Sequence, residues 1–134
     1  MSSLSPPQNV IGRTGADHVS ISVSGRSDDW ISATIGVRAA AWSGNCRAGF
    51  HQGELLRFAA EIDRLYRDLT GVAELSPIEP YLSLKRTGDG KGHVLVEGKA
   101  RDGLSYSTYL AFRFEIDQTD LSAIVRGMQA ADPA

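Results

Sequence analysis

Few residues of the chain have the types and spacing that enzyme or metal chemistry requires. The sequence contains three histidines, His18, His51 and His93, and one cysteine, Cys46. No histidine has a second ligand at the short spacing that is typical of a zinc site. Cys46 would need a histidine base to act as a nucleophile, and only His51 lies near it in sequence. Because Cys46 alternates in phase with apolar neighbours, we favour a thiol packed in the core.

Two further patterns resemble functional motifs only superficially. The segment GDGKG at Gly88–Gly92 is rich in glycine. It lacks the spacing of a phosphate-binding loop and lies between two expected strands, so we interpret it as a hairpin loop. Glu54 and Glu61 are interleaved with arginines, which is typical of a solvated helix surface rather than an acid–base pair. We therefore predict no catalytic residue, no metal site and no cofactor, and a protein that is not an enzyme.

The clearest element in the sequence is an amphipathic helix over about residues 51–70. Leu55, Ile62, Leu65 and other apolar residues recur at steps of three and four, which places them on one stripe. Charged residues occupy the opposite side, several of them as opposite pairs four residues apart. Gly71 is expected to end the helix. Because one helix cannot bury its own stripe, the rest of the chain must supply the opposing surface.

Alternating apolar and polar residues predict strands on both sides of this helix. Before the helix we expect strands at 18–25 and 30–42, with residues 43–50 forming either a bent continuation of the second strand or a separate strand. After the helix we expect a covering loop at 72–80. Three further strands, joined by hairpin turns, are expected at 81–86, 93–101 and 104–116.

These elements predict an α+β fold in the order ββ(β)αβββα. We expect a two-layer sandwich in which one antiparallel sheet of five or six strands is covered on one face by the long helix and a short C-terminal helix at about 119–130. The length of the chain favours a single domain, at 18–131. Residues 1–17 are rich in Ser, Pro and Gly and are expected to form a flexible N-terminal arm.

The overall composition is that of an ordinary globular protein, with 42% hydrophobic and 22% charged residues. A net charge of −2 gives no reason to expect nucleic acid or an anionic membrane as a partner. The N-terminal residues lack the basic start and apolar core of a signal peptide. A single cysteine fits a reducing compartment. We therefore expect a cytoplasmic location, whereas the oligomeric state is left open.

The sheet face turned away from the helices is the predicted partner-binding surface. Expected outward positions combine small hydroxyl residues with Tyr, Trp and Arg, the usual anchors of protein interfaces. We also expect that the N-terminal arm or a partner covers at least one of Trp30 and Trp42. A merely water-facing sheet is the alternative. The predicted partner-binding residues are Arg38, Trp42, Lys85, Lys99, Tyr109 and Arg113.

Several phrases of the sequence resemble the WapI-type bacterial immunity proteins and their uncharacterised relatives. The phrases are DDWISATIGV at 28–37, LTGVAEL at 69–75 and FEIDQTDL at 114–121, and the resemblance extends from about residue 28 to the C-terminus. It implies a two-layer α/β protein that binds and neutralises a cognate toxin of a polymorphic or contact-dependent system, and it implies no catalytic residue. A small-ligand-binding domain and a subunit of a housekeeping complex are the alternatives.

Overall fold

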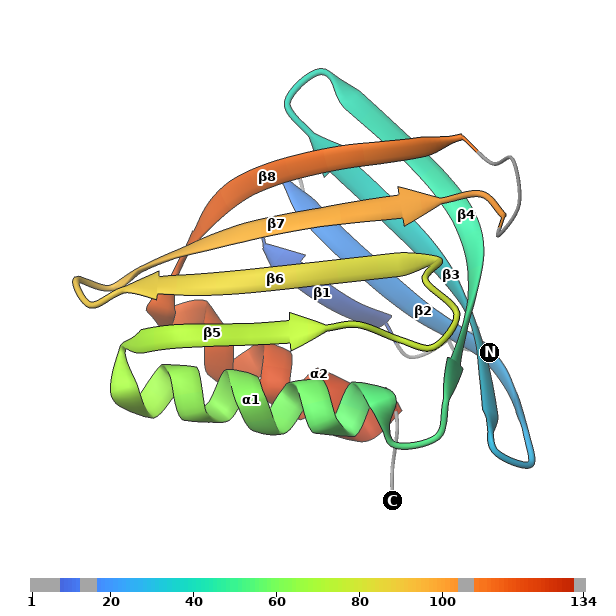
Figure 1. Ribbon diagram of the computed structural model, residues 1–134, viewed down its shortest axis with the longest axis horizontal. Helices are drawn as coiled ribbons and strands as arrows, with labels where there is room; N and C mark the ends of the chain where they lie inside the picture. Colours follow the sequence, from blue (N-terminus) through green and yellow to red (C-terminus); the bar gives the residue numbers. More distant parts are fainter. Residues whose placement is uncertain (1–7, 13–16, 104–107, 132–134) are drawn as a thin grey trace, which may run out of the picture.

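A computed structural model describes residues 8–12, 17–103 and 108–131. Each half of the chain forms a four-stranded antiparallel sheet followed by a helix (Figure 1). The first half comprises β1 (Gln8–Gly12), β2 (His18–Ser27), β3 (Trp30–Ala39), β4 (Trp42–His51) and α1 (Glu54–Asp68). The second half comprises β5 (Thr70–Leu75), β6 (Leu82–Asp89), β7 (His93–Arg101), β8 (Tyr109–Asp117), the 3₁₀ turn η1 (Gln118–Asp120) and α2 (Leu121–Ala131).

The predicted single sheet of five or six strands is wrong, because the structure contains two separate sheets, β1-β2-β3-β4 and β5-β6-β7-β8. In each sheet every strand pairs with its neighbours in sequence, and α1 separates the two ladders. The predicted order lacked two strands. β5 includes the first part of the segment 72–80 that was expected to be a loop, and β1 lies within the predicted arm at 1–17. Residues 1–7 and 13–16 of that arm lie outside the described part, so its flexibility stays a prediction.

The open question of residues 43–50 is resolved in favour of a separate strand. The chain turns at Ala40 and Ala41, and β4 then runs antiparallel to β3. Ala40 adopts a φ of 55° to make this tight turn. Alanine rarely takes a positive φ, so the sequence carried no turn signal at this point. Ser43–Asn45 lie in the first part of β4.

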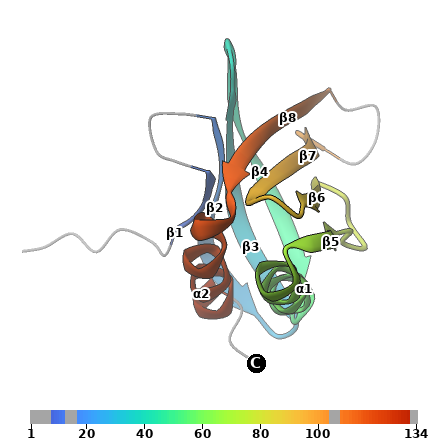
Figure 2. The ribbon, with the colours of Figure 1, turned by 90° about the vertical axis from the view of Figure 1, so that its left-hand side faces the viewer.

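The two helices connect the sheets to each other. α1 follows the first sheet but packs against β5 of the second, whereas α2 follows the second sheet and packs against β1 of the first. The helices also pack against each other. Figure 2 shows both helices at one end of the molecule, with the two sheets extending away from them. The expected layer of two helices over one sheet face is therefore replaced by two sheets with the helices closing one end.

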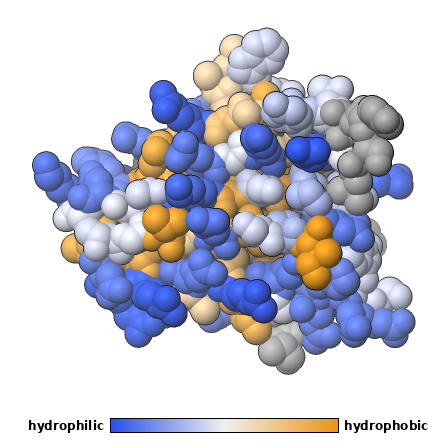
Figure 3. All heavy atoms as spheres, in the orientation of Figure 1, coloured by the Kyte–Doolittle hydropathy of each residue, from blue (hydrophilic) through white to orange (hydrophobic). Residues whose placement is uncertain are grey.

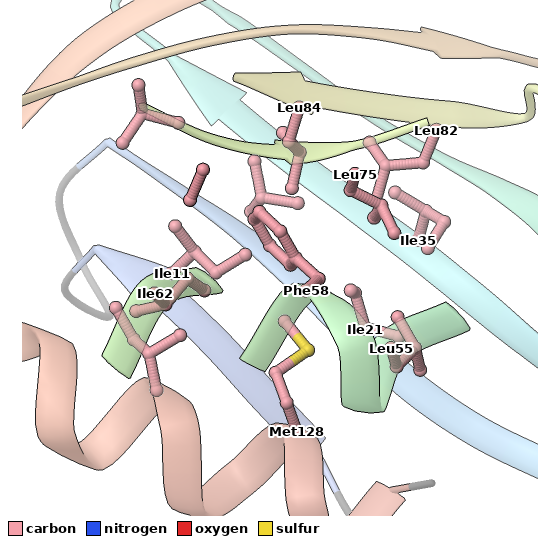
Figure 4. Close-up of a cluster of buried hydrophobic side chains, with 14 of the residues drawn as sticks. Ile11, Ile21, Ile35, Leu55, Phe58, Ile62, Leu75, Leu82, Leu84 and Met128 are labelled. Carbon is pink, nitrogen blue, oxygen red and sulfur yellow. The ribbon is translucent and has the colours of Figure 1, made fainter. Parts of the chain in front are cut away.

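The apolar stripe predicted for the long helix is confirmed, and it forms the centre of the core. Leu55, Phe58 and Ile62 are at most 1% exposed and contribute to a single buried cluster. Figure 4 shows them among side chains from both sheets and from α2. The helix ends earlier than expected, because Leu69 adopts the left-handed C-cap conformation and donates its backbone N–H to Leu65.

The carboxylates of α1 hold neighbouring segments of backbone. Glu54 accepts a hydrogen bond from the His51 N–H at 2.6 Å and another from the Ile78 N–H at 2.9 Å. Glu61 accepts one from the Glu74 N–H at 3.0 Å. These contacts fix the end of β4, the segment after β5 and β5 itself against the helix. Glu54 and Glu61 therefore act as structural acceptors.

We expect Glu54→Ala to lower the free energy of unfolding by about 1–3 kcal/mol, because two backbone N–H groups lose a charged acceptor. Urea denaturation followed by circular dichroism measures this change. Arg64→Ala is the matched control, since Arg64 is exposed on the same helix. Equal stability of the two variants would contradict a structural role for the Glu54 carboxylate.

Candidate partner-binding site

A groove opens between the β3–β4 hairpin and the adjoining ends of β7 and β8, with a volume of about 370 Å³. It exists because the hairpin extends past β8 (Figure 1), so the second sheet does not cover the far end of the hairpin. Trp42–Asn45 are accordingly all exposed. Apolar groups form much of the lining and a few polar groups surround them. The lining residues are Ile35, Val37, Trp42–Cys46, Ala100–Asp102 and Thr108–Leu110.

Trp42 is the principal exposed aromatic residue of this groove, with 68% of its surface accessible. Its register partner is Ala39, so it lies on the same sheet face as the apolar side chains of β3. The prediction that Trp42 occupies the outer face is therefore wrong, because the two-residue turn inverts the alternation that a continuous strand would have. Trp42 is exposed because this part of the inner face lies beyond the second sheet.

Tyr109 forms the opposite side of the groove and is 52% exposed. The Lys99 Nζ atom lies 5.1 Å from the centre of its ring, and the Arg101 Cζ atom lies 5.5 Å from it. A cation at this distance from an aromatic ring is attracted by the electron-rich ring face. The structure thus brings the predicted residues Lys99 and Tyr109 together. It adds Arg101, which alternation along β7 placed on the same face as Lys99.

Of the six predicted residues, Trp42 and Tyr109 line the groove, and Lys99 contacts Tyr109 without lining it. Lys85 and Arg113 lie on the outer face of the second sheet, and Arg38 lies on the first sheet, opposite Ser43. A register row across the four strands of the second sheet consists of Glu74, Lys85, Glu97 and Arg113. Opposite charges on neighbouring strands attract each other, so this row largely compensates its own charge. Figure 3 shows a mostly hydrophilic face with separate hydrophobic patches.

Cys46 lines the groove but lacks the surroundings of a nucleophile. Burial, together with the negative charge of Asp102, raises the pKa of the Cys46 thiol. A higher pKa reduces the thiolate fraction at neutral pH. The only histidine near it in sequence, His51, lies on the opposite face of β4, because the two positions differ by the odd number five. Cys46 is half-buried and packs against the core, in agreement with the predicted packed thiol.

Trp30 is covered by its own sheet. It lies over Gly49, where an added Cβ atom would come within 1.9 Å of the indole ring. Its ring meets the His51 ring edge-on, with centroids 5.0 Å apart. Neither the N-terminal arm nor a partner is needed to explain the partial burial of this residue.

The GDGKG segment is a hairpin loop between β6 and β7, as expected. The Asp89 Oδ1 atom accepts the backbone N–H groups of Lys91 at 2.6 Å and His93 at 3.1 Å, while Oδ2 contacts the His93 ring at 3.1 Å. These bonds, led by the one from Lys91, lower the pKa of Asp89. Within the described ranges no group of three or more potential ligands could hold a metal ion. No helix of the same ranges is long and apolar enough to cross a membrane.

Arg86 is a buried charge that lies apart from the groove. Its side chain points inward from β6, is 0% exposed, and places Cζ 5.2 Å from the centre of the Phe58 ring. Among the described residues, none provides a hydrogen-bond partner for any of its three guanidinium nitrogens. Burial lowers the pKa of Arg86 to about 9. The inward orientation of Arg86 could have been predicted from the sequence, because Arg86 alternates in phase with the apolar residues Leu82 and Leu84.

Comparison with known proteins gives a match to a protein family and a match to a solved structure. The model of the immunity protein WapI-like family matches residues 10–131, which confirms the resemblance noted in the sequence. No curated protein sequence matches the chain. A chain of the structure described as "Crystal structures of trypanosoma bruciei MRP1/MRP2" is 14% identical, with a TM-score of 0.46 over 96% of this chain and 84% of that one.

Proposed function

The chain belongs to the immunity protein WapI-like family, and from this premise we propose that it protects a bacterial cell by binding one cognate protein toxin in the cytoplasm. Family membership supports an immunity function, a toxin as partner and a role without catalysis. The proposal adds the mode of action, in which the bound chain blocks the toxin physically. The raised pKa of the Cys46 thiol fits such a non-catalytic role, as does the location of His51 on the opposite face of β4.

The observation that carries the proposal is the pair of exposed aromatic residues at the groove. Trp42 and Tyr109 are 68% and 52% exposed, on either side of a lining that is largely apolar. Burying a large aromatic side chain contributes roughly 1.5–3 kcal/mol, and such residues dominate the affinity of protein interfaces. The chain keeps both residues in water, where they contribute little to its own stability. We therefore place the toxin-binding site at the groove.

Co-expression tests the proposed function directly. The C-terminal domain of a toxin encoded immediately upstream of this chain is expected to stop bacterial growth when expressed alone. Co-expression of this chain is expected to restore growth, whereas an unrelated immunity protein is not. Failure of this chain to restore growth would contradict the proposed function.

We expect Trp42→Ser and Tyr109→Ser each to weaken toxin binding about tenfold or more, which corresponds to roughly 1.4 kcal/mol. Both side chains are exposed, so the melting temperature should change little. Ile78→Ser is the matched control, because Ile78 is 76% exposed and does not line the groove. Isothermal titration calorimetry with the purified toxin domain measures the affinities. Equal affinity of all three variants would place the binding site elsewhere.

A further inference from the structure

We propose that the toxin binds by adding an extended segment to the free edge of β4 at Ser43–Arg47, with an apolar side chain of that segment seated in the groove and an acidic side chain near Arg101. This inference rests on the proposed function and specifies how the partner is recognised. It names both the element of this chain that forms the contact and the chemistry of the toxin segment. Four observations carry it.

First, β4 is an edge strand whose outward backbone groups at Ser43–Arg47 have no backbone partner among the described residues. It pairs with β3 on one side and ends the first sheet on the other. The hydrogen bond from the Gln52 N–H to the Asp29 carbonyl fixes which residues of β4 bond to β3. Because hydrogen-bonded and non-hydrogen-bonded pairs alternate in an antiparallel ladder, the N–H and C=O groups of Ser43, Asn45 and Arg47 point away from β3. Such an edge is a template for another strand.

Second, the first half of β4 is exposed on both faces. All four residues of Trp42–Asn45 are exposed. By contrast, the edge strands β1 and β5 pack against α2 and α1, respectively. Nothing lies within 4 Å of a Cβ atom placed on Gly44. A strand added here would meet no side chain from Gly44.

Third, the groove lies where the side chains of an added strand would point. Trp42, Gly44 and Cys46 face the groove from β4. Side chains directly opposite each other on paired strands share a face of the sheet. Every second residue of an added strand would therefore project over the apolar lining formed by Ile35 and Val37. One apolar or aromatic residue of the toxin would fill this space.

Fourth, basic residues outnumber acidic ones around this edge. Arg38 and Arg47 are exposed on the hairpin, and Lys99 and Arg101 flank Tyr109 across the groove. The acidic residues of this region are Asp102, which lines the groove, and Asp17, whose Oδ1 accepts the Ala40 N–H at 2.9 Å. With four basic residues against two acidic ones this region is net positive, although the chain as a whole carries a net charge of −2. A segment with carboxylates complements it.

Amide hydrogen exchange measured by NMR on the wild-type chain tests the pairing residue by residue. In the free chain, the outward N–H groups of Ser43, Asn45 and Arg47 should exchange quickly. The inward groups of Gly44 and Cys46 should exchange slowly. Addition of the toxin domain is expected to slow the three outward amides at least about tenfold. Unchanged exchange at these three amides in the saturated complex would overturn the inference.

Proline substitution tests the same bonds by affinity. Asn45→Pro removes one outward N–H, and an edge strand tolerates proline at such a position. We expect binding of the toxin domain to weaken about tenfold or more. Val72→Pro is the matched control: it removes an outward N–H from β5, the edge of the other sheet, and should leave affinity unchanged. If Asn45→Pro folds and binds like wild type, strand addition is wrong.

Salt dependence tests the proposed contact between Arg101 and an acidic side chain of the toxin. Affinity of the wild-type chain should fall as salt is raised, since ions screen attraction between exposed charges. Arg101→Glu should weaken binding about tenfold at low salt and reduce this salt dependence. An unaltered salt dependence in Arg101→Glu would remove the acidic contact from the inference.

Growth rescue by wild type, combined with unprotected β4 amides, would overturn strand addition while the proposed function stands. Absence of both rescue and binding would overturn both proposals.

Discussion

Ile62→Asp is expected to yield a chain that does not fold. Ile62 is fully buried on α1, in the cluster that joins the two sheets and α2 (Figure 4). An ionised carboxylate at this position would lose its hydration without a partner, which costs several kcal/mol. The lost isoleucine side chain adds roughly 2–5 kcal/mol. The sum is comparable to the whole stability of a typical domain, about 5–15 kcal/mol.

Circular dichroism and thermal denaturation measure this effect, and two variants make it specific. Arg64→Ala changes an exposed residue of the same helix and should melt within a few degrees of wild type. Ile62→Val keeps the apolar character and should cost only about 0.5–1.5 kcal/mol. A cooperative transition for Ile62→Asp at the wild-type temperature would show that Ile62 is not in the core.

The long helix could be predicted from the sequence because its signal is local and repeated. Leu55, Phe58, Ile62 and Leu65 recur over a continuous segment, and all four are buried. Which strands pair is a long-range property, and alternation along one strand does not encode it. The turn at Ala40–Ala41 also lacks the Gly, Asn or Pro that usually marks one. One missed turn was enough to merge β3 with the start of β4.

The candidate site was predictable only where strand alternation decides the outcome. Lys99 and Tyr109 were assigned to one exposed face, and the structure places them in contact. Trp42 was assigned to the wrong face, because its orientation depends on the turn before it. The groove itself could not be predicted, since it arises from the relative placement of the two sheets. The role of Arg101 could be inferred only from the strand register, which places it opposite Tyr109.

Arg86→Met is expected to raise the free energy of unfolding by about 1–4 kcal/mol, the range seen when buried ionic groups are replaced by apolar ones. Arg86 is fully buried, and no described residue accepts a hydrogen bond from its guanidinium group. Its contact with the Phe58 ring offsets part of the lost hydration. Methionine keeps much of the side-chain volume without the charge, so the Phe58 contact persists. Chemical denaturation at neutral pH measures the gain.

Arg86→Ala separates the charge from the packing. Alanine also removes the charge but leaves a cavity beside Phe58, and the loss of a large core side chain costs roughly 2–5 kcal/mol. We therefore expect Arg86→Ala to be clearly less stable than Arg86→Met. A destabilised Arg86→Met would indicate that the guanidinium group is stabilised in the folded chain, although no described residue accepts a hydrogen bond from it.

The pH dependence of the Arg86→Met gain tests whether charge is its source. The folded-state pKa of about 9 lies well below the ordinary value of an arginine side chain. Below about pH 9 both states bind the proton, so the full penalty is present in wild type. Between these two values the unfolded state binds more protons, and the stability of wild type therefore rises relative to Arg86→Met. The gain should shrink from about pH 8 to about pH 10.5, because the variant shares every other titrating group. A gain independent of pH would instead point to packing as its source.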